Sequence, residues 1–397
     1  MQFSKKAMQI EPSITLNITA KAKELKSKGI DIVSFGAGEP DFNTPKNIID
    51  KAINAMNEGK TKYTQTAGIL EIREAISKKL KDENNLDYKS SQIIVSTGAK
   101  QSLANAFLAI LNPGDEVIVS IPYWVSYPEL IKLADGVPVF INTGKDHDYK
   151  FTIESLNKSL TARTKAIILN SPNNPTGTIY TKDELLVIAK FAEENNLVII
   201  SDEIYEKLIY ENEKHISIGS LTKYAYENTI LINGLSKSSA MTGWRVGYAA
   251  GCEEVIKLMT SIQSHMTSNT NSIAQYASVE ALSGSKDELE KMTLEFSKRR
   301  GYMIERLKSI KNISFIEPKG AFYVMVDVSS FYNKYYKERK IVDSLSFSQV
   351  LLEEKNTAVI PGIGFGADEY IRLSYAISIE NIEKGLNRIE EFLNEIK

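Results

Sequence analysis

Short hydrophobic runs alternate with longer amphipathic stretches through the middle of the chain. The runs are rich in Ile and Val, and they occupy residues 92–97, 115–120, 165–170, 196–201, 229–233 and 246–251. Strands with nearly continuous apolar runs are buried on both faces, as in a mostly parallel sheet covered by helices. The alternation therefore predicts an α/β fold in which a mostly parallel central sheet has helices on both faces.

Two of the amphipathic stretches carry a signal for the start of a helix. Thr181 has Glu184 three residues later, and Ser285 stands in the same relation to Glu288. This spacing is that of a capping box, in which each side chain accepts a bond from a free backbone N–H of the first turn. The first box predicts a helix between two of the strands. The second predicts a long charged helix that runs to about residue 310.

The sequence changes character near residue 285. After the long charged helix come a hairpin-like segment over 314–328 and a last amphipathic helix over 379–397. A chain of 397 residues also exceeds what a single hydrophobic core usually supports. We expect an N-terminal segment (1–40) that joins the small domain, a large domain (41–284) and a smaller α+β domain (285–397).

Composition and charge exclude several classes of protein. The 48 basic and 50 acidic side chains give a net charge of −2, whereas a nucleic-acid binder carries a basic excess. The single cysteine, Cys252, cannot form an intramolecular disulfide, which favours a reducing compartment. The three histidines lie far apart and form no local metal-ligand spacing. Without a signal peptide or an apolar run of membrane length, we expect a cytoplasmic protein with no metal and no membrane or nucleic-acid partner.

Distinct polar segments follow four of the predicted strands. They read GAKQS after 92–97, SPNNPTG after 165–170, DEIYE after 196–201 and GLSKSS after 229–233. In open α/β sheets, ligands bind beyond the carboxyl ends of the strands, so these segments are predicted to form one composite site. Taken singly, each segment has a simpler explanation: a surface lysine, a helix cap at Asp202, or a turn.

Taken together, these segments closely resemble the pyridoxal-phosphate-dependent aminotransferases of the aspartate aminotransferase fold. The motifs, in the family's order, are GEPDF (38–42), STGAKQSL (96–103), PYWVSYPE (122–129), SPNNPTG (171–177), SDEIYE (201–206), LSKSSAMTGWRVGY (235–248) and YIRLSYA (370–376). The resemblance covers almost the whole chain, and it is strongest to the bacterial subgroup of class I that uses a lysine for the distal carboxylate. It implies the fold-type I architecture and pyridoxal 5′-phosphate as the cofactor.

The resemblance also implies the contacts to the cofactor. Lys237 matches the catalytic lysine, which bonds the cofactor's aldehyde and carries the proton, and Asp202 matches the carboxylate at the pyridine nitrogen. The remaining matches are Tyr205 and Asn174 at the ring's phenolic oxygen, Trp124 on the ring face, and Gly98, Ala99, Lys100, Ser236 and Arg245 at the phosphate. Tyr63 matches a phosphate-binding tyrosine that comes from a second subunit, so a homodimer with shared active sites is implied.

The same resemblance implies how the substrate is bound. Arg372 matches the arginine that holds the α-carboxylate, and Lys100 matches the lysine that meets the distal carboxylate of an acidic substrate. The other expected substrate contacts are Gly38, Trp124, Asn174, Ser13 and Thr15. The implied reaction is the reversible transfer of the amino group of L-aspartate to 2-oxoglutarate, with amino-acid and 2-oxo-acid substrates.

Four other functions compete with this interpretation. An aminotransferase of the same family can act on aromatic amino acids, alanine or prephenate. A pyridoxal-phosphate lyase uses the same fold and the same cofactor residues. A transcription regulator with this fold as its sensor needs an N-terminal helix-turn-helix domain, for which the roughly 40 preceding residues are too few. A nicotinamide dehydrogenase needs a G-x-G-x-x-G motif after an early strand, and the Gly-rich segment 361–368 is not placed there.

Overall fold

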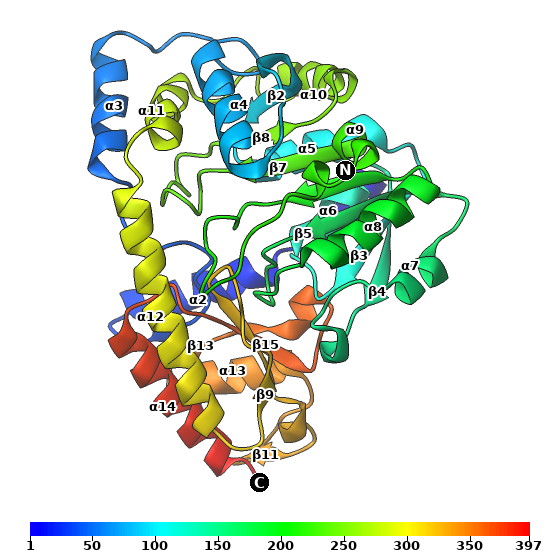
Figure 1. The fold of residues 1–397 in the computed structure, drawn as a ribbon. Coiled ribbons are helices and arrows are strands. Elements are labelled where there is room, and N and C mark those ends of the chain that lie inside the picture. The colour runs from blue at the N-terminus through cyan, green and yellow to red at the C-terminus, as the bar shows by residue number, and fades with distance from the viewer.

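A seven-stranded sheet forms the centre of the larger part of the molecule (Figure 1). The computed structural model describes all residues, 1–397. The sheet has the order β2-β8-β7-β6-β5-β3-β4. Its strands are β2 (Ile93–Ser96), β3 (Glu116–Ile121), β4 (Val137–Asn142), β5 (Thr164–Asn170), β6 (Val198–Asp202), β7 (Thr229–Gly234) and β8 (Gly247–Ala250). Strands β3 to β7 are parallel, and β8 runs antiparallel to both of its neighbours, so the predicted mostly parallel sheet is confirmed.

Six of the seven strands coincide with the predicted hydrophobic runs, and β4 does not. Its side chains are mostly exposed or half-buried, because β4 lies at the edge of the sheet. An edge strand needs no continuous apolar run, and it tolerates a proline such as Pro138. The apolar-run pattern that identifies the central strands is therefore absent from this one.

Helices cover both faces of the large sheet, as the alternation of side chains requires. On one face, Ile94 and Ile168 pack in a cluster with α5 (Ala99–Ile110), α6 (Ser126–Leu133) and α10 (Glu253–Met266). On the other face, Ile93 joins a cluster with α3 (Lys46–Asn57), α4 (Leu70–Asn84) and α11 (Ser272–Ser283). Ile167 faces α7 (Ile153–Ser159), α8 (Lys182–Glu194) and α9 (Lys223–Asn228). Successive strand residues point to opposite faces, so each buried run supplies two cores.

The two predicted capping boxes have different outcomes. At α8, the Thr181 and Glu184 side chains bond each other's backbone N–H groups, as expected. At α12 (Asp287–Ser309), the prediction is wrong, because the cap residue is Lys286 and its side chain makes no cap. The Lys286 ammonium instead donates to the Ala281 and Leu282 carbonyls at the end of α11. The Ser285 hydroxyl then accepts from the backbone of Asp287, one position short of the capping-box geometry.

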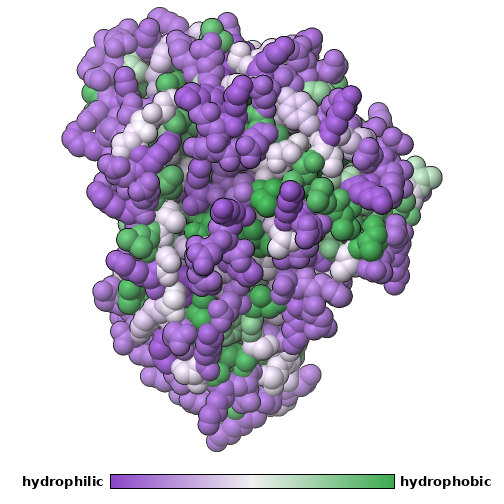
Figure 2. Space-filling model, in the orientation of Figure 1, coloured by the Kyte–Doolittle hydropathy of each residue, from purple (hydrophilic) through white to green (hydrophobic).

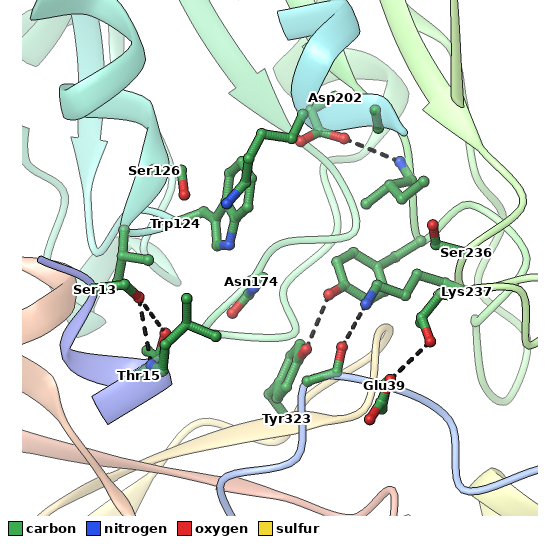
Figure 3. Close-up of a pocket in the computed structure, with 18 of the residues that line it drawn as sticks. Ser13, Thr15, Glu39, Trp124, Ser126, Asn174, Asp202, Ser236, Lys237 and Tyr323 are labelled. Carbon is green, nitrogen blue, oxygen red and sulfur yellow. Dashed lines mark hydrogen bonds between the residues drawn. The ribbon is translucent and has the colours of Figure 1, made fainter. Parts of the chain in front are cut away.

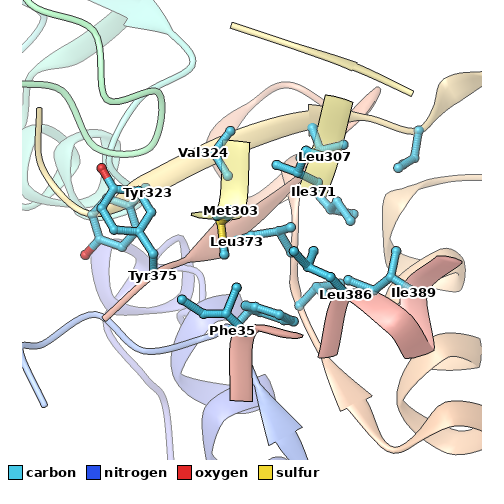
Figure 4. Packing of buried hydrophobic residues seen from close by; sticks show 14 of the residues in the cluster. Phe35, Met303, Leu307, Tyr323, Val324, Ile371, Leu373, Tyr375, Leu386 and Ile389 are labelled. Atoms are coloured by element: carbon cyan, nitrogen blue, oxygen red, sulfur yellow. The ribbon is translucent and has the colours of Figure 1, made fainter. Parts of the chain in front are cut away.

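A smaller four-stranded antiparallel sheet follows α12, in the order β14-β15-β10-β9. Its strands are β9 (Ser314–Phe315), β10 (Tyr323–Asp327), β14 (Ile360–Pro361) and β15 (Tyr370–Ser374), and the predicted hairpin over 314–328 is confirmed by the pairing of β9 with β10. Helices α12, α13 (Ser344–Lys355) and α14 (Ile379–Glu395) pack on it. Figure 4 shows part of the resulting core, in which Phe35, Met303, Leu373 and Leu386 meet.

The N-terminal segment lies beside this small sheet. Helix α2 (Ile14–Ser27) contacts β13 (Thr357–Ala358) and β14, and β1 (Val33–Ser34) pairs with β13. The remaining α-helix is α1 (Lys5–Met8), and the remaining strands are β11 (Tyr335–Tyr336) and β12 (Arg339–Lys340), which form a short hairpin. We keep the division into 1–40, 41–284 and 285–397 as a proposal that agrees with this arrangement.

Hydrophilic residues cover most of the face seen in Figure 2, with hydrophobic residues exposed in smaller areas. None of the helices is long and apolar enough to span a bilayer.

Candidate active site

A cavity of about 420 Å³ opens where the carboxyl ends of the large sheet's strands face the small sheet and α2. It brings together residues that are far apart in the sequence. Of the residues expected from the sequence, it is lined by Ser13, Thr15, Gly38, Ala99, Lys100, Trp124, Asn174, Asp202, Tyr205, Ser236, Lys237, Arg245 and Arg372. Gly98 adjoins it at the start of α5. Tyr63 lies elsewhere, and its side chain is 91% exposed. Figure 3 shows Trp124, Asn174, Asp202 and Lys237 around the same space.

Asp202 ends β6 with its carboxylate buried inside the molecule. The Tyr127 hydroxyl donates to its Oδ2 at 2.7 Å, and the Ile204 backbone N–H donates to its Oδ1 at 3.2 Å. Burial raises the pKa of Asp202 to about 6, and these two hydrogen bonds only partly oppose that rise. A buried carboxylate with a raised pKa gains from a nearby cation, and a protonated pyridine nitrogen is such a cation.

Lys237 follows β7, next to Ser236, and its half-buried side chain turns into the cavity. Its Nζ donates to the Gly38 carbonyl and lies 5.8 Å from the centroid of the Tyr205 ring. Burial lowers the pKa of Lys237 to about 8, although the nearby Glu39 carboxylate opposes this. An appreciable fraction of the amine is therefore uncharged near neutral pH, as a nucleophile and proton acceptor requires.

The start of α5 forms a cradle for an anion. Gly98 caps the helix with no side chain and a φ of +83°, and a Cβ there would lie 2.4 Å from Arg245 Nη2. Glycine thus lets the guanidinium lie directly against the helix N-terminus. Arg245 has a φ of +56°, and its Nη1 donates to the Thr242 carbonyl at 2.9 Å. A helix N-terminus and a guanidinium together suit a phosphate group.

Arg372 reaches the cavity from β15 of the small sheet. It is 3% exposed, its Nη1 donates to Asn174 Oδ1 at 2.9 Å, and its Nε has no hydrogen-bond partner. Burial lowers the pKa of Arg372.

Gly38 also lines the cavity, but a Cβ there would meet only the Tyr323 hydroxyl, at 3.7 Å. The chain's own packing therefore leaves room for a side chain at position 38.

Lys100 stands in the first turn of α5, where its Nζ lies 5.0 Å from the centroid of the Trp124 ring. Burial lowers its pKa, and repulsion from Arg245 adds to the effect. On the α2 side, the Ser13 and Thr15 hydroxyls lie 2.9 Å apart. Ser13 also caps α2 by accepting from the Leu16 N–H, so its presence has a structural reason as well.

The charge balance of the cavity shows what it can hold. Its walls carry five cationic side chains, namely Lys23, Lys100, Lys237, Arg245 and Arg372, against the two carboxylates of Glu39 and Asp202. A pocket with such an excess of positive charge fits anionic groups, and it keeps one buried carboxylate for a cation. A phosphorylated pyridine cofactor and a dicarboxylic substrate meet both conditions, so the residues present fit pyridoxal 5′-phosphate.

Among the cavity residues that were not predicted as functional, three make side-chain hydrogen bonds in or beside the site. Tyr127, in the first turn of α6, bonds Asp202, Glu39 accepts from the Thr242 hydroxyl at 2.7 Å, and Tyr323 lies beside Tyr205 (Figure 3). Tyr127 and Glu39 stand inside motifs that carry the family resemblance, and that position is a signal that could have found them. Tyr323 stands in a hydrophobic strand pattern, which gives no chemical signal.

The structure also brings together ionisable residues outside the cavity. His215 Nε2 lies 2.8 Å from Glu203 Oε2, and the possible ligand atoms of Glu203, Glu206 and His215 all lie within 4.8 Å of one another. The histidine spacing in the sequence did not predict this cluster. The Lys79 ammonium bonds Glu206 within it, so a side-chain cation of the protein already balances that carboxylate.

The fold and the cavity define a class of protein: a mostly parallel sheet that faces a smaller antiparallel sheet across a cavity is the architecture of a fold-type I pyridoxal-phosphate-dependent transferase. Residues 30–389 match the family model described as aminotransferase class I and II. The chain therefore belongs to the class I and II aminotransferases, and it is a pyridoxal-phosphate-dependent enzyme of that family.

Individual relatives are similar to this protein along almost the whole chain. The chain is 50% identical over 384 residues to the aspartate aminotransferase of Bacillus sp. (strain YM-2), covering 97% of each protein. It is 47% identical over 393 residues to the aspartate aminotransferase of Bacillus subtilis (strain 168), covering 99% of each. The solved structure of Thermus thermophilus aspartate aminotransferase with maleate has a TM-score of 0.93 at 42% identity, over 99% of this chain and 100% of that chain.

Proposed function

We propose that this protein is an aspartate aminotransferase, which transfers the amino group of L-aspartate to 2-oxoglutarate and gives oxaloacetate and L-glutamate. The observation that carries this proposal is a cavity in which Arg372 and Lys100 are cations without a carboxylate partner. Two such cations suit the two carboxylates of aspartate and of 2-oxoglutarate. The relatives named aspartate aminotransferase support the same substrate.

The residues that would hold pyridoxal 5′-phosphate are those around Asp202 and Gly98. Asp202 would pair with the ring nitrogen, Tyr205 and Asn174 would donate to the ring's phenolic oxygen, and Trp124 would stack on the ring. The phosphate would lie among Gly98, the free backbone N–H groups of Ala99 and Lys100, and the side chains of Ser236 and Arg245. When bound, the cofactor supplies the carbonyl carbon that receives the amino group and a cationic ring that withdraws electrons from the substrate's α-carbon.

In this proposal Lys237 is the proton carrier. Its Nζ is partly uncharged near neutral pH because burial lowers the pKa to about 8. It can take the proton from the substrate's α-carbon as a general base and return it as a general acid. The Gly38 carbonyl accepts a hydrogen bond from this amine and so fixes where it points.

Substrate binding would involve both domains. Arg372 from β15 would hold the α-carboxylate in a bidentate grip, with Gly38 beside it, while Lys100 from α5 would meet the distal carboxylate near Ser13 and Thr15. Because the contacts come from both domains and from α2, binding would draw these parts together and exclude water from the reacting atoms.

We also propose a homodimer with shared active sites in the cytoplasm. Tyr63 is 91% exposed and lies outside the cavity of its own chain, as expected of a residue that acts in a partner's site. Helix α3 ends six residues before Tyr63 in the chain, and its exposed apolar residues, such as Ile53 and Met56, suit an interface. The free thiol of Cys252 fits a reducing compartment.

The reaction can be tested with aspartate alone. We expect the pyridoxal-phosphate-loaded protein to convert one equivalent of aspartate to oxaloacetate and then stop until a 2-oxo acid is added, because the amino group stays on the cofactor. Product analysis and the change in visible absorbance measure this half-reaction. Release of CO2 with formation of alanine, in place of oxaloacetate, would show a lyase instead. Equal rates with phenylalanine or alanine would show a broad aminotransferase.

Replacement of Lys100 tests the distal contact. We expect Lys100→Ala to lower kcat/KM for aspartate by about 10²-fold. The variant leaves the distal carboxylate of aspartate without a cationic partner in a partly buried site, which costs roughly 3 kcal/mol of binding free energy. Alanine has no distal carboxylate, so its kcat/KM should change by less than about threefold. Lys182→Ala, in the first turn of α8 and outside the cavity, is the matched control. Equal losses for aspartate and alanine would contradict the assignment.

A further inference from the structure

Arg372 is a buried cation with little polar support from the protein. Its hydrogen bond to Asn174 is the one hydrogen bond that the guanidinium makes, and its Nε is unpaired. Two aromatic rings are close instead: the centroid of Tyr323 lies 4.2 Å and that of Phe365 lies 5.1 Å from the guanidinium carbon. Guanidinium groups stack on aromatic faces, and this contact is strongest where water is excluded.

The register of the small sheet explains why Tyr323 reaches Arg372. Strand β10 pairs antiparallel with β15, so that Met325 is opposite Arg372 and Tyr323 is opposite Ser374. Tyr323 and Arg372 are therefore diagonal neighbours on the same face of the sheet, within reach of an aromatic ring and a long side chain. The small side chain of Ser374, opposite the ring, leaves the ring free to lean toward the guanidinium.

The Tyr323 hydroxyl makes a second contact, across the domains. It lies 3.0 Å from the Tyr205 hydroxyl, and the two rings meet edge to face with centroids 5.8 Å apart. Tyr205 belongs to the segment that follows β6 of the large sheet. Burial raises the pKa of both hydroxyls, so both remain neutral and one donates to the other. Figure 3 shows Tyr323 pointing from the small domain toward this bond.

We propose that Tyr323 is a positioning residue for the α-carboxylate site, whose ring holds the Arg372 guanidinium in place and whose hydroxyl anchors that ring to Tyr205. This inference rests on the proposed function, in which Arg372 receives the α-carboxylate. Without the ring, the guanidinium is held by one hydrogen bond and by Phe365 alone, so its two donor edges are no longer fixed for a bidentate contact. Every amino-acid substrate has an α-carboxylate, so the loss should be common to all of them.

Substitutions at Tyr323 separate the ring from the hydroxyl. We expect Tyr323→Leu to raise KM by about 30-fold for aspartate and for alanine alike, the factor that corresponds to a desolvated cation–π contact. The affinity of the pyridoxal-phosphate-loaded protein for maleate, measured by titration calorimetry, should fall by a similar factor. The kcat should change by less than about threefold, because this contact serves the ground state and the transition state equally. Tyr323→Phe keeps the ring, so it should stay within about fivefold of the wild type.

Two further variants make the outcome decisive. Tyr375→Leu removes a buried tyrosine of the same core that lies outside the cavity, and it should leave KM and maleate affinity unchanged. If it raises KM as much as Tyr323→Leu does, the effect is a general loss of packing and the inference is wrong. If Arg372→Lys weakens maleate binding and Tyr323→Leu does not, the inference is wrong while the proposed function stands. If Arg372→Lys has no effect either, the proposed role of Arg372 fails and takes the inference with it.

Discussion

Lys237→Ala should lower the rate of oxaloacetate formation from aspartate by at least about 10⁴-fold, because general acid–base catalysis alone contributes about 10² to 10⁴ and the lysine also binds the cofactor. The stability of the folded protein should not decrease. Burial lowers the pKa of Lys237 to about 8, so its charged form is disfavoured in the folded state, and its removal relieves that cost. We therefore expect a melting temperature equal to or above that of the wild type.

A chemical readout distinguishes this prediction from a general loss of activity. Borohydride reduction of the loaded protein, followed by peptide mass mapping, should place the cofactor on the peptide that contains Lys237, and the Lys237→Ala variant should carry no label. Lys223→Ala, on the exposed surface of α9, should keep both the activity and the label. A label on another lysine of the wild-type protein would refute the assignment of Lys237.

Asp202→Asn should lower kcat by about 10³-fold. Removing one member of a buried charge pair costs about 3–5 kcal/mol, and each 1.36 kcal/mol is tenfold in rate. Asparagine is almost the same size, so the loss reflects the charge and not the packing. In the absence of the cofactor the pKa of Asp202 is about 6, since burial raises it. The carboxylate becomes neutral as the pH falls through 6, and the wild-type protein should release its cofactor more readily there.

The control for Asp202 is its hydrogen-bond partner. Tyr127→Phe removes the 2.7 Å bond to Asp202 but keeps the carboxylate, so kcat should fall by no more than about tenfold. Cofactor retention after dialysis at pH 5.5 and pH 8 should depend on pH in the wild type and should lose that dependence in Asp202→Asn. Full activity of Asp202→Asn would show that no cation faces this carboxylate.

The central strands and the helix at Thr181 could be predicted because their signals are local. Ile167 and Ile168 are neighbours in one strand, and they face opposite hydrophobic cores. A strand that is buried on both faces needs apolar residues at every position, so it appears in the sequence as a continuous apolar run. Strand β4 was not predicted, because a strand at the edge of the sheet does not need apolar residues on both faces. The capping box at Ser285 was wrong because Lys286 binds the end of α11, a contact that depends on how two helices meet.

The residues of the candidate site also fall into those that a local sequence motif could predict and those that only tertiary contacts identify. Lys237, Asp202 and Arg372 stand in motifs with a recognisable order, and the cavity does contain all three. Tyr323 carries no such signal, since its importance comes from a diagonal pairing with Arg372 and from the approach of Tyr205. Likewise, the raised pKa of Asp202 and the lowered pKa of Lys237 depend on what surrounds these groups after folding.

By itself, the sequence determined the alternating α/β architecture, the family and the chemical identity of the reactive groups, because hydrophobic periodicity and motif order are properties of neighbouring residues. Tertiary structure alone decided which strands pair, how β8 is oriented, and that five cations and two carboxylates share one cavity. Contacts such as that between Arg372 and Asn174 join residues almost 200 positions apart. The energy of such a contact depends on the distance between the two groups in space, and a pattern of neighbouring residues in the sequence does not predict that distance.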